Sequence, residues 1–161
     1  GNFLLIFLYL LYMFFIFLFF LFYDLLFFSF NLSFLTKIIQ KVQHKPIRVK
    51  PLGALICYFA LSTILFLTLS WDYSHTFLLG SSIYAVYEGT NYAIFQDWPF
   101  SMVLLDTLWG GLLFILVKFS YRFIKNWYAP FLFFSYKNVF QTLTKLREAP
   151  QTGESRKRGQ T

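Results

Sequence analysis

Long apolar runs separated by short polar stretches dominate the chain, and they predict helices that lie in a membrane. Residues 3–23 carry no charged and no strongly polar side chain, and the run continues to about residue 30 with Asp24 near its end. A membrane span needs about 20 apolar residues, so we expect one long, tilted or protruding helix over residues 3–30. No Gly or Pro within it would fold it into a hairpin.

Three further apolar segments complete an all-α integral membrane bundle of about four transmembrane helices; they are residues 52–69, 76–95 and 99–117. Pro51 suits a first helical turn, because its missing N–H is not needed there. The short link between the last two segments predicts antiparallel neighbours. Residues 31–50 are interpreted as a basic connector with a short interfacial helix over residues 32–42.

The chain changes character after the fourth apolar segment. We therefore divide it into a transmembrane domain over residues 1–123, an interfacial amphipathic segment over residues 124–148 and a basic polar tail over residues 149–161. Pro130 is expected to interrupt the amphipathic segment. The tail has almost no apolar content, and a solvated chain is expected for it.

Composition supports a membrane protein and excludes an ordinary soluble domain. Only 13% of the residues are charged and 58% are hydrophobic, whereas soluble domains carry about 25% charged residues. The net charge is +7, and Lys and Arg are absent between residues 51 and 117. We expect the basic flanks to dock on membrane lipid or on other protein subunits, capsid proteins among them, through Lys37, Lys41, Lys45, Arg48, Lys50, Arg156, Lys157 and Arg158. Three consecutive charges in the tail are too weak a signal to predict a nucleic-acid partner.

Several polar groups fall inside the apolar segments and recur on shared helix faces. The predicted intramembrane polar network contains Asp24, Tyr84, Tyr87, Glu88, Asn91, Asp106 and Trp109. Four glycines are expected to permit close helix packing: Gly80, Gly89, Gly110 and Gly111. The acids either are protonated and hydrogen-bonded between helices or line a wet cavity that forms a proton or cation path.

Three motifs in this region resemble a known family. They are the run Tyr-Glu-Gly-Thr-Asn-Tyr-Ala at residues 87–93, the pair Trp98-Pro99, and Asp-Thr-Leu-Trp-Gly at residues 106–110. Together with an Asp late in the first helix, matched here by Asp24, they resemble the signature of the DUF2177 family of predicted membrane proteins over about residues 3–120. The resemblance implies four spans, and it implies no activity, since the family has no known function.

The chain departs from that family pattern at a few positions. Glu88 stands in place of the usual Asp, Gly89 in place of a Leu, and Phe27 where a Trp often follows the first Asp. The segment beyond residue 123 looks like an addition. Similar proteins occur in bacteria and in large DNA viruses, which makes the internal membrane of such a virus one candidate location.

Three functional hypotheses follow from these patterns. The first is a structural or scaffolding membrane protein within a larger assembly, such as a viral inner membrane and its capsid. The alternative is a small proton- or cation-coupled carrier that uses the intramembrane carboxyl groups. The third is a membrane hydrolase using Asp24 and Asp106, although the Gly-x-Gly-Asp half of the intramembrane aspartyl-protease pattern is missing. We assign no catalytic residue, no metal site and no cofactor.

Overall fold

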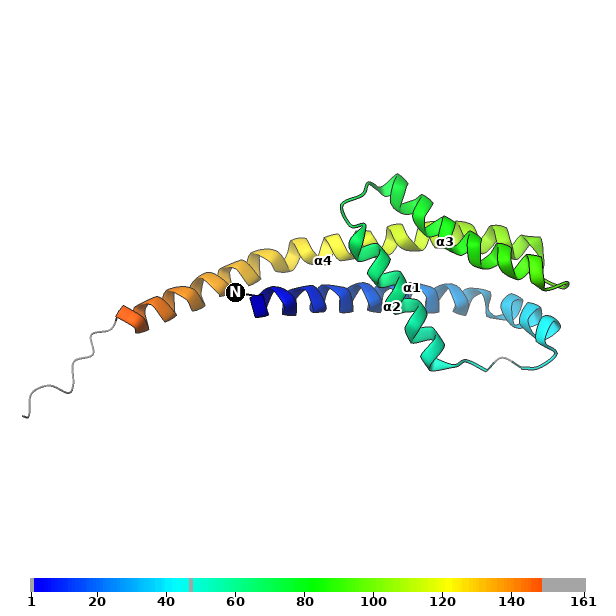
Figure 1. Ribbon diagram of the computed structural model, residues 1–161, viewed down its shortest axis with the longest axis horizontal. Helices are drawn as coiled ribbons and strands as arrows, with labels where there is room; N and C mark the ends of the chain where they lie inside the picture. The colour runs from blue at the N-terminus through cyan, green and yellow to red at the C-terminus, as the bar shows by residue number, and fades with distance from the viewer. Residues whose placement is uncertain (1, 47, 149–161) are drawn as a thin grey trace, which may run out of the picture. The chain divides into compact units, whose positions relative to one another are not determined.

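The chain folds into four α-helices in the computed structural model, which describes residues 2–46 and 48–148 (Figure 1). The helices are α1 (Asn2–Gln43), α2 (Pro51–Leu67), α3 (Tyr73–Ile94) and α4 (Phe100–Glu148). The described residues contain no strand, which confirms the all-α prediction. The chain divides into two compact units, Gly1–Arg122 and Phe123–Thr161, and the first contains the candidate site described below.

Two of the helices are long and apolar enough to cross a bilayer. Within the described residues these segments are Ile6–Gln43 and Phe100–Trp127, while α2 is apolar but has only 17 residues. In Figure 1, α2 crosses α1 steeply instead of running beside it as a span of an up-and-down bundle would. Four transmembrane helices therefore remain a prediction, whereas two candidate spans are present.

Helix α1 continues well past the end predicted for it. The connector expected at residues 31–50 is helical as far as Gln43, so the separate interfacial helix is wrong and the true connector begins at His44. The polar side chains of this stretch do not break the helix because they bond to it. Ser29 Oγ donates to the carbonyl of Leu25 (2.6 Å), and Asn31 Nδ2 donates to that of Phe27 (2.9 Å).

The extension of α1 also packs on the connection between α3 and α4. Leu35 and Ile38 form a small buried cluster with Met102, and the partly buried Trp98 packs against it. Burial of these apolar side chains stabilises the extended part of the helix through tertiary packing. Lys41, one of the predicted docking residues, forms an ion pair with Asp97 (2.9 Å) at the exposed edge of this cluster.

Helix α4 likewise runs further than predicted. The expected break at Pro130 is absent, because α4 is helical from Phe100 to Glu148. Proline removes one backbone donor and leaves most of the helical bonds on either side able to form. The predicted polar tail at residues 149–161, with Arg156, Lys157 and Arg158, lies outside the described residues.

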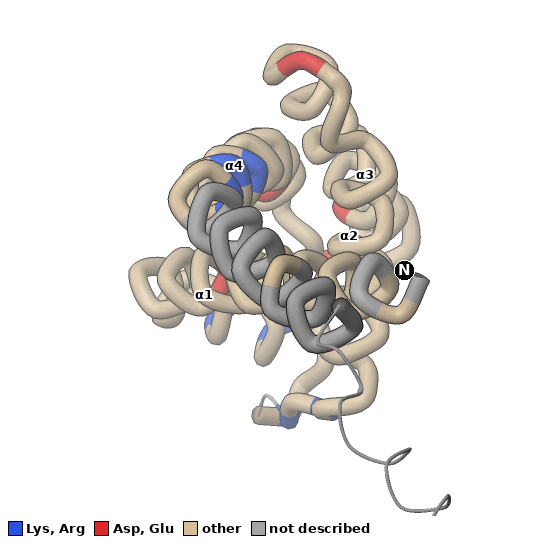
Figure 2. Tube along the Cα trace, turned by 90° about the vertical axis from the view of Figure 1, so that its left-hand side faces the viewer, with Lys and Arg blue, Asp and Glu red and all other residues tan. Residues whose placement is uncertain are grey.

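The core of the first unit is built from α1, α2 and α4. Seen end-on in Figure 2, α1, α3 and α4 lie around a common centre. The fully buried apolar side chains there are Ile16, Phe20, Leu65, Leu113, Phe114 and Val117. Phe20 and Phe114 meet edge to face with ring centroids 5.1 Å apart, an arrangement that aromatic quadrupoles favour.

Close packing of α3 on α4 depends on glycine, as predicted for three of the four glycines. A Cβ atom at Gly80 would collide with the backbone oxygen of Gly110, and one at Gly110 would collide with the Tyr84 ring. A Cβ at Gly111 would likewise meet Ser81. The prediction for Gly89 is wrong, since no atom lies within 4 Å of the position its Cβ would take.

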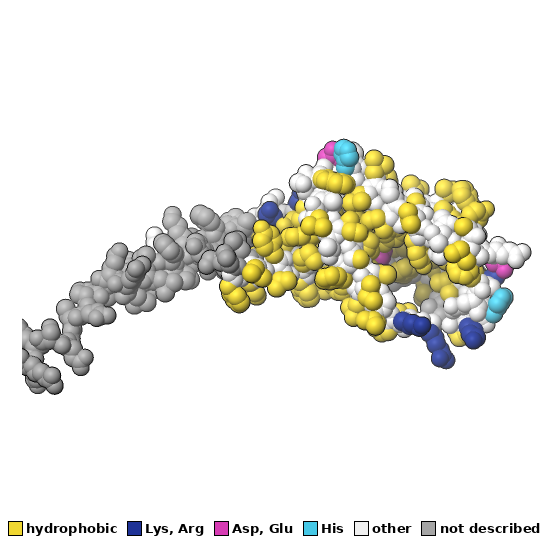
Figure 3. Space-filling view, in the orientation of Figure 1, with side chains coloured by type: hydrophobic (Ala, Val, Ile, Leu, Met, Phe, Trp, Pro, Cys, Tyr) yellow, Lys and Arg dark blue, Asp and Glu magenta, His cyan; other side chains and the backbone are white. Residues whose placement is uncertain are grey.

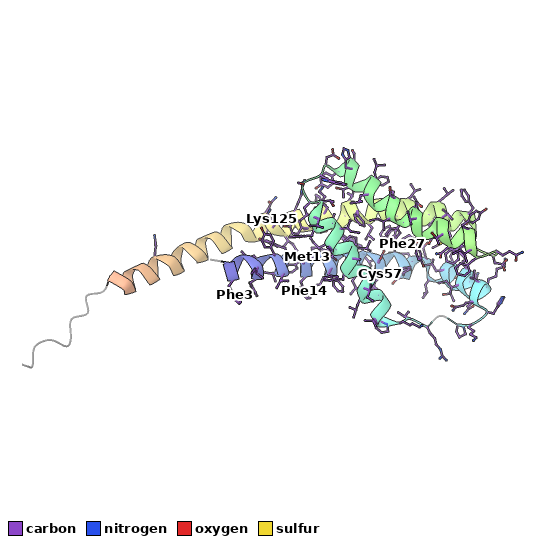
Figure 4. All side chains as sticks on the ribbon, in the orientation of Figure 1. Phe3, Met13, Phe14, Phe27, Cys57 and Lys125 are labelled. Atoms are coloured by element: carbon purple, nitrogen blue, oxygen red, sulfur yellow. The ribbon has the colours of Figure 1, made fainter. Side chains whose placement is uncertain are left out.

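Much of the surface of the first unit is apolar. Hydrophobic side chains cover large areas of the face shown in Figure 3, and Phe3 and Phe14 extend outward from α1 in Figure 4. Phe3 is 84% exposed and Leu18 is 39% exposed, so the apolar surface follows α1 over many turns. Exposed apolar area on this scale indicates contact with lipid or another apolar surface.

A polar connection joins α2 to α3. The Asp72 carboxylate accepts hydrogen bonds from the backbone N–H of His75 (2.8 Å) and from its ring, and so caps the N-terminus of α3. Lys118 of α4 is fully buried beneath this connection, where its ammonium donates to the carbonyl of Trp71 and to Thr76 Oγ1 (2.7 Å). These bonds hold the start of α3 against α4.

The Asp72 cap predicts a pH-dependent contribution to stability. The backbone N–H and the ring of His75 hold the pKa of the Asp72 carboxyl below its ordinary value. The charged carboxylate therefore stabilises the fold above the unfolded-state pKa of about 3.9, and this contribution is lost as pH falls through the lower folded-state pKa. We expect wild type to be more stable than Asp72→Asn at pH 6 and the difference to vanish in acid. Denaturant unfolding of both chains in detergent checks this, and a difference that grows in acid contradicts it.

Candidate functional site, a buried carboxyl cluster

Three carboxyl groups from three helices are buried in the first unit. Asp24 of α1 is 5% exposed, Glu88 of α3 is 1% exposed and Asp106 of α4 is 8% exposed. Asp106 lies within electrostatic range of both other acids. We call these three side chains the carboxyl cluster. The sequence predicted that these acids would turn towards one another, and the helix packing brings them together.

Asp24 accepts hydrogen bonds from two other helices. Trp109 Nε1 of α4 donates to its Oδ1 (2.7 Å), and the Tyr84 hydroxyl of α3 donates to its Oδ2 (3.3 Å). Tyr58 of α2 lies within electrostatic range of this carboxyl. Both oxygens of Asp24 therefore have a donor, and hydrogen bonds through its side chain join α1 to α3 and α4.

The position of the Trp109 indole is set by stacking. Its ring lies nearly parallel to that of Phe27, with an interplanar angle of 10° and centroids 4.4 Å apart. Phe27 is one turn of α1 beyond Asp24, and Figure 4 labels it. The Phe27 ring at this position directs the indole N–H towards the carboxylate.

Glu88 and Asp106 form a second and different arrangement. Their side chains are within hydrogen-bonding distance of each other. Trp98, from the connection between α3 and α4, donates through Nε1 to Glu88 Oε2 (2.7 Å). Glu88 Oε1 is buried and has no donor among the described residues. Two carboxyl groups in contact repel each other when both are charged and attract when one retains a proton.

No basic side chain compensates the carboxyl cluster within the described part of the chain. The ion pairs found there join Lys41 to Asp97 and His75 to Asp72, both on the exposed surface. Buried Lys118 bonds instead to the connection between α2 and α3. The cluster is thus an acidic site without a protein counter-charge, which is the arrangement expected of a group that binds protons or cations in a membrane.

The structure divides the predicted polar network. Five of its members come together as expected: Asp24, Tyr84, Glu88, Asp106 and Trp109. The prediction for Tyr87 is wrong, because its side chain is 60% exposed. Successive helical residues are about 100° apart, so a residue adjacent to buried Glu88 is rotated away from the cluster. Asn91 is partly buried, and its Nδ2 has no acceptor among the described residues.

Two contributors to the carboxyl cluster, and one buried residue outside it, were not predicted from the sequence. Tyr58 lies in an apolar helix with no polar periodicity, so no local signal marked it. Trp98 belongs to the Trp-Pro motif but was interpreted as part of a link. Lys118 was counted with the basic flank, although it is buried and bonded. Aromatic donors near intramembrane acids are the signal that would have identified the first two.

The predicted docking residues are at the surface wherever the structure describes them. Lys37, Lys45, Arg48 and Lys50 are exposed around the end of α1 and the connection to α2. Their exposure is compatible with anionic lipid or an acidic partner, and the choice between these stays a prediction.

Comparison with known proteins gives one result. No curated protein and no solved structure matches the chain significantly. The family described as "Predicted membrane protein (DUF2177)" matches residues 5–120. This range covers most of the 161-residue chain and includes all three acids of the carboxyl cluster together with their aromatic donors. The chain therefore belongs to the DUF2177 family of predicted membrane proteins.

Proposed function

We propose that this protein is a small multi-pass membrane carrier that couples proton or cation binding at the carboxyl cluster to the movement of a solute. The observation that carries the proposal is the convergence of Asp24, Glu88 and Asp106 without a basic partner in the described residues. Isolated negative charges are costly in a membrane, so such a site favours proton or cation binding.

The packing around the cluster is compatible with this role. Helices α3 and α4 approach closely through Gly80 and Gly110, and Glu88 and Asp106 interact further along the same helix pair. A change in the charge of Glu88 and Asp106 therefore alters the free energy of this helix interface directly. Coupling between ion binding and helix movement needs such a dependence.

The scaffold hypothesis has less to support it. It depended on basic flanks that dock on partner proteins, and the flank at residues 149–161 lies outside the described residues. A role in a viral membrane or with capsid proteins therefore stays a prediction from sequence, testable by whether the chain co-purifies with particles. The interhelical hydrogen bonds of Asp24 serve architecture under either hypothesis.

The carrier proposal is tested with purified protein in vesicles that contain a trapped pH-sensitive dye. Proton and sodium gradients are imposed in turn, and amino acids, sugars, organic acids and organic cations are added outside. We expect one solute class to produce gradient-dependent flux in wild type. Glu88→Gln should reduce that flux to the level of empty vesicles, because glutamine keeps the shape of the side chain but cannot exchange a proton.

The matched control is Asp97→Asn, which removes a carboxylate from the exposed end of α3 and α4 rather than from the cluster. It is expected to transport like wild type. Flux that is equal in Glu88→Gln and wild type contradicts the proposal, as does the absence of flux with every solute class and both gradients.

A further inference from the structure

The geometry points to a specific ligand for the carboxyl cluster. Resting on the proposed function, we infer that the bound ion is a single proton, that Glu88 and Asp106 share it, and that it enters from the end of the bundle covered by Trp98. With the proton, an O–H of one carboxyl donates to the carboxylate of the other and the pair carries one negative charge. Without it, the pair carries two.

The hydrogen bonds distinguish this pair from Asp24. Both oxygens of Asp24 accept from protein donors, namely Trp109 and Tyr84. The hydrogen bonds of Asp24 are therefore complete in the structure without a contribution from the neighbouring pair.

The hydrogen bonding of Glu88 is incomplete. Only its Oε2 has a donor, the Trp98 indole, while the fully buried Oε1 has none within the described residues. A buried acceptor without a donor is costly. A proton shared with Asp106 supplies a donor to the pair, because the two side chains are within hydrogen-bonding distance of each other.

The ligand chemistry favours a proton over a metal ion. The described residues contain no group of three or more His, Cys, Asp or Glu side chains placed to hold a metal. Metal ions such as Ca²⁺ need six or more oxygen ligands. The donor that the structure places on the pair is instead the N–H of Trp98. Donors of this kind repel a metal cation.

Access to the pair differs between the two ends of the bundle. Trp98 lies in the connection between α3 and α4. Its side chain is partly buried and donates a hydrogen bond to Glu88. Towards the opposite end, fully buried apolar side chains including Phe20 and Phe114 fill the core. On the first route a proton meets Trp98 and the small cluster of Leu35, Ile38 and Met102, whereas on the second it meets the larger apolar core.

Infrared spectroscopy of the purified full chain in detergent tests the shared proton. At pH 7 we expect the carbonyl band of one protonated carboxylic acid per chain, shifted when H₂O is replaced by D₂O. Glu88→Gln and Asp106→Asn should each move or remove this band, and the double variant should lack it. Asp97→Asn should leave it unchanged.

Each alternative outcome overturns the inference. A wild-type chain without the band has no such proton, and this measurement needs no variant to fold. A band that survives in the double variant places the proton on another group, and a band unmoved by either single substitution shows that it is not shared. The result is independent of transport: a band without flux rejects only the carrier, whereas sodium-coupled flux without the band rejects only the inference.

The rate of hydrogen–deuterium exchange of the same band tests the route. Trp98→Ala is expected to accelerate exchange because it uncovers Glu88. Trp71→Ala is the matched control, since Trp71 lies in the connection at the opposite end of α3 and does not contact the pair. Exchange that is accelerated by the Trp71 substitution and not by the Trp98 substitution overturns the assigned entrance.

Discussion

Replacing Gly80 by alanine is expected to lower the free energy of unfolding by about 1–3 kcal/mol, the usual cost of overpacking a close helix contact. The new Cβ would collide with the backbone oxygen of Gly110 and with the Phe114 ring. Backbone cannot rotate away as a flexible side chain can, so α3 and α4 must separate. Separation also strains the bond from Tyr84 to Asp24, which lies one turn further along the same interface.

Gly89→Ala is the matched control because it lies on the same helix. No atom is within 4 Å of the position that the new Cβ would take, and alanine is favoured over glycine inside a helix by about 0.5–1 kcal/mol. The control should therefore be neutral or stabilising. Reversible unfolding of both variants in mixed detergent micelles measures the difference, and equal stabilities would show that the α3–α4 contact is not close.

Replacing Lys118 by methionine is expected to lower stability by about 2–4 kcal/mol. Methionine keeps the length and apolar character of the side chain, so the change removes chiefly the ammonium group. That group donates to the carbonyls of Trp71 and Asp72 and to Thr76 Oγ1. Hydrogen bonds to charged groups contribute about 1.5–3 kcal/mol, and buried acceptors left without donors add to the loss.

The control for this experiment is Lys37→Met, an equivalent change at an exposed position of α1. It should alter the free energy of unfolding by less than about 0.5 kcal/mol, as surface substitutions do. Limited proteolysis at the connection between α2 and α3 provides a second measurement, since the loss of Lys118 should release this segment. If Lys118→Met is as stable and as protease-resistant as the control, the buried ammonium has no structural role.

Local patterns in the sequence were sufficient for the helices that carry continuous apolar runs. The start of α2 at Pro51 and the antiparallel α3–α4 pair follow from residues adjacent in the chain. The end of α1 was misplaced because it depends on contacts with Met102 and Trp98, far away in sequence. The helix break predicted at Pro130 was wrong because the loss of one backbone donor does not end a long helix.

The candidate site shows the same division. Helical spacing identified Tyr84 and Glu88 as one face of α3, and both belong to the cluster. Spacing alone also included Tyr87, which the rotation of α3 directs outward. Tyr58 was missed since its hydroxyl becomes relevant only when α2 crosses α1 beside Asp24. No pattern within a single helix contains information about that crossing.

By itself the sequence determined that the protein needs an apolar environment and that its apolar segments are helical. A chain with 58% hydrophobic and 13% charged residues cannot cover itself with water-compatible groups, and its apolar runs favour helices whose backbone bonds are satisfied internally. Only the tertiary structure decided which acids meet and how their hydrogen bonding differs. It gave Asp24 donors on both oxygens and left Glu88 and Asp106 to each other, because helix rotation and crossing, which arise from packing between distant segments, set the direction of each side chain.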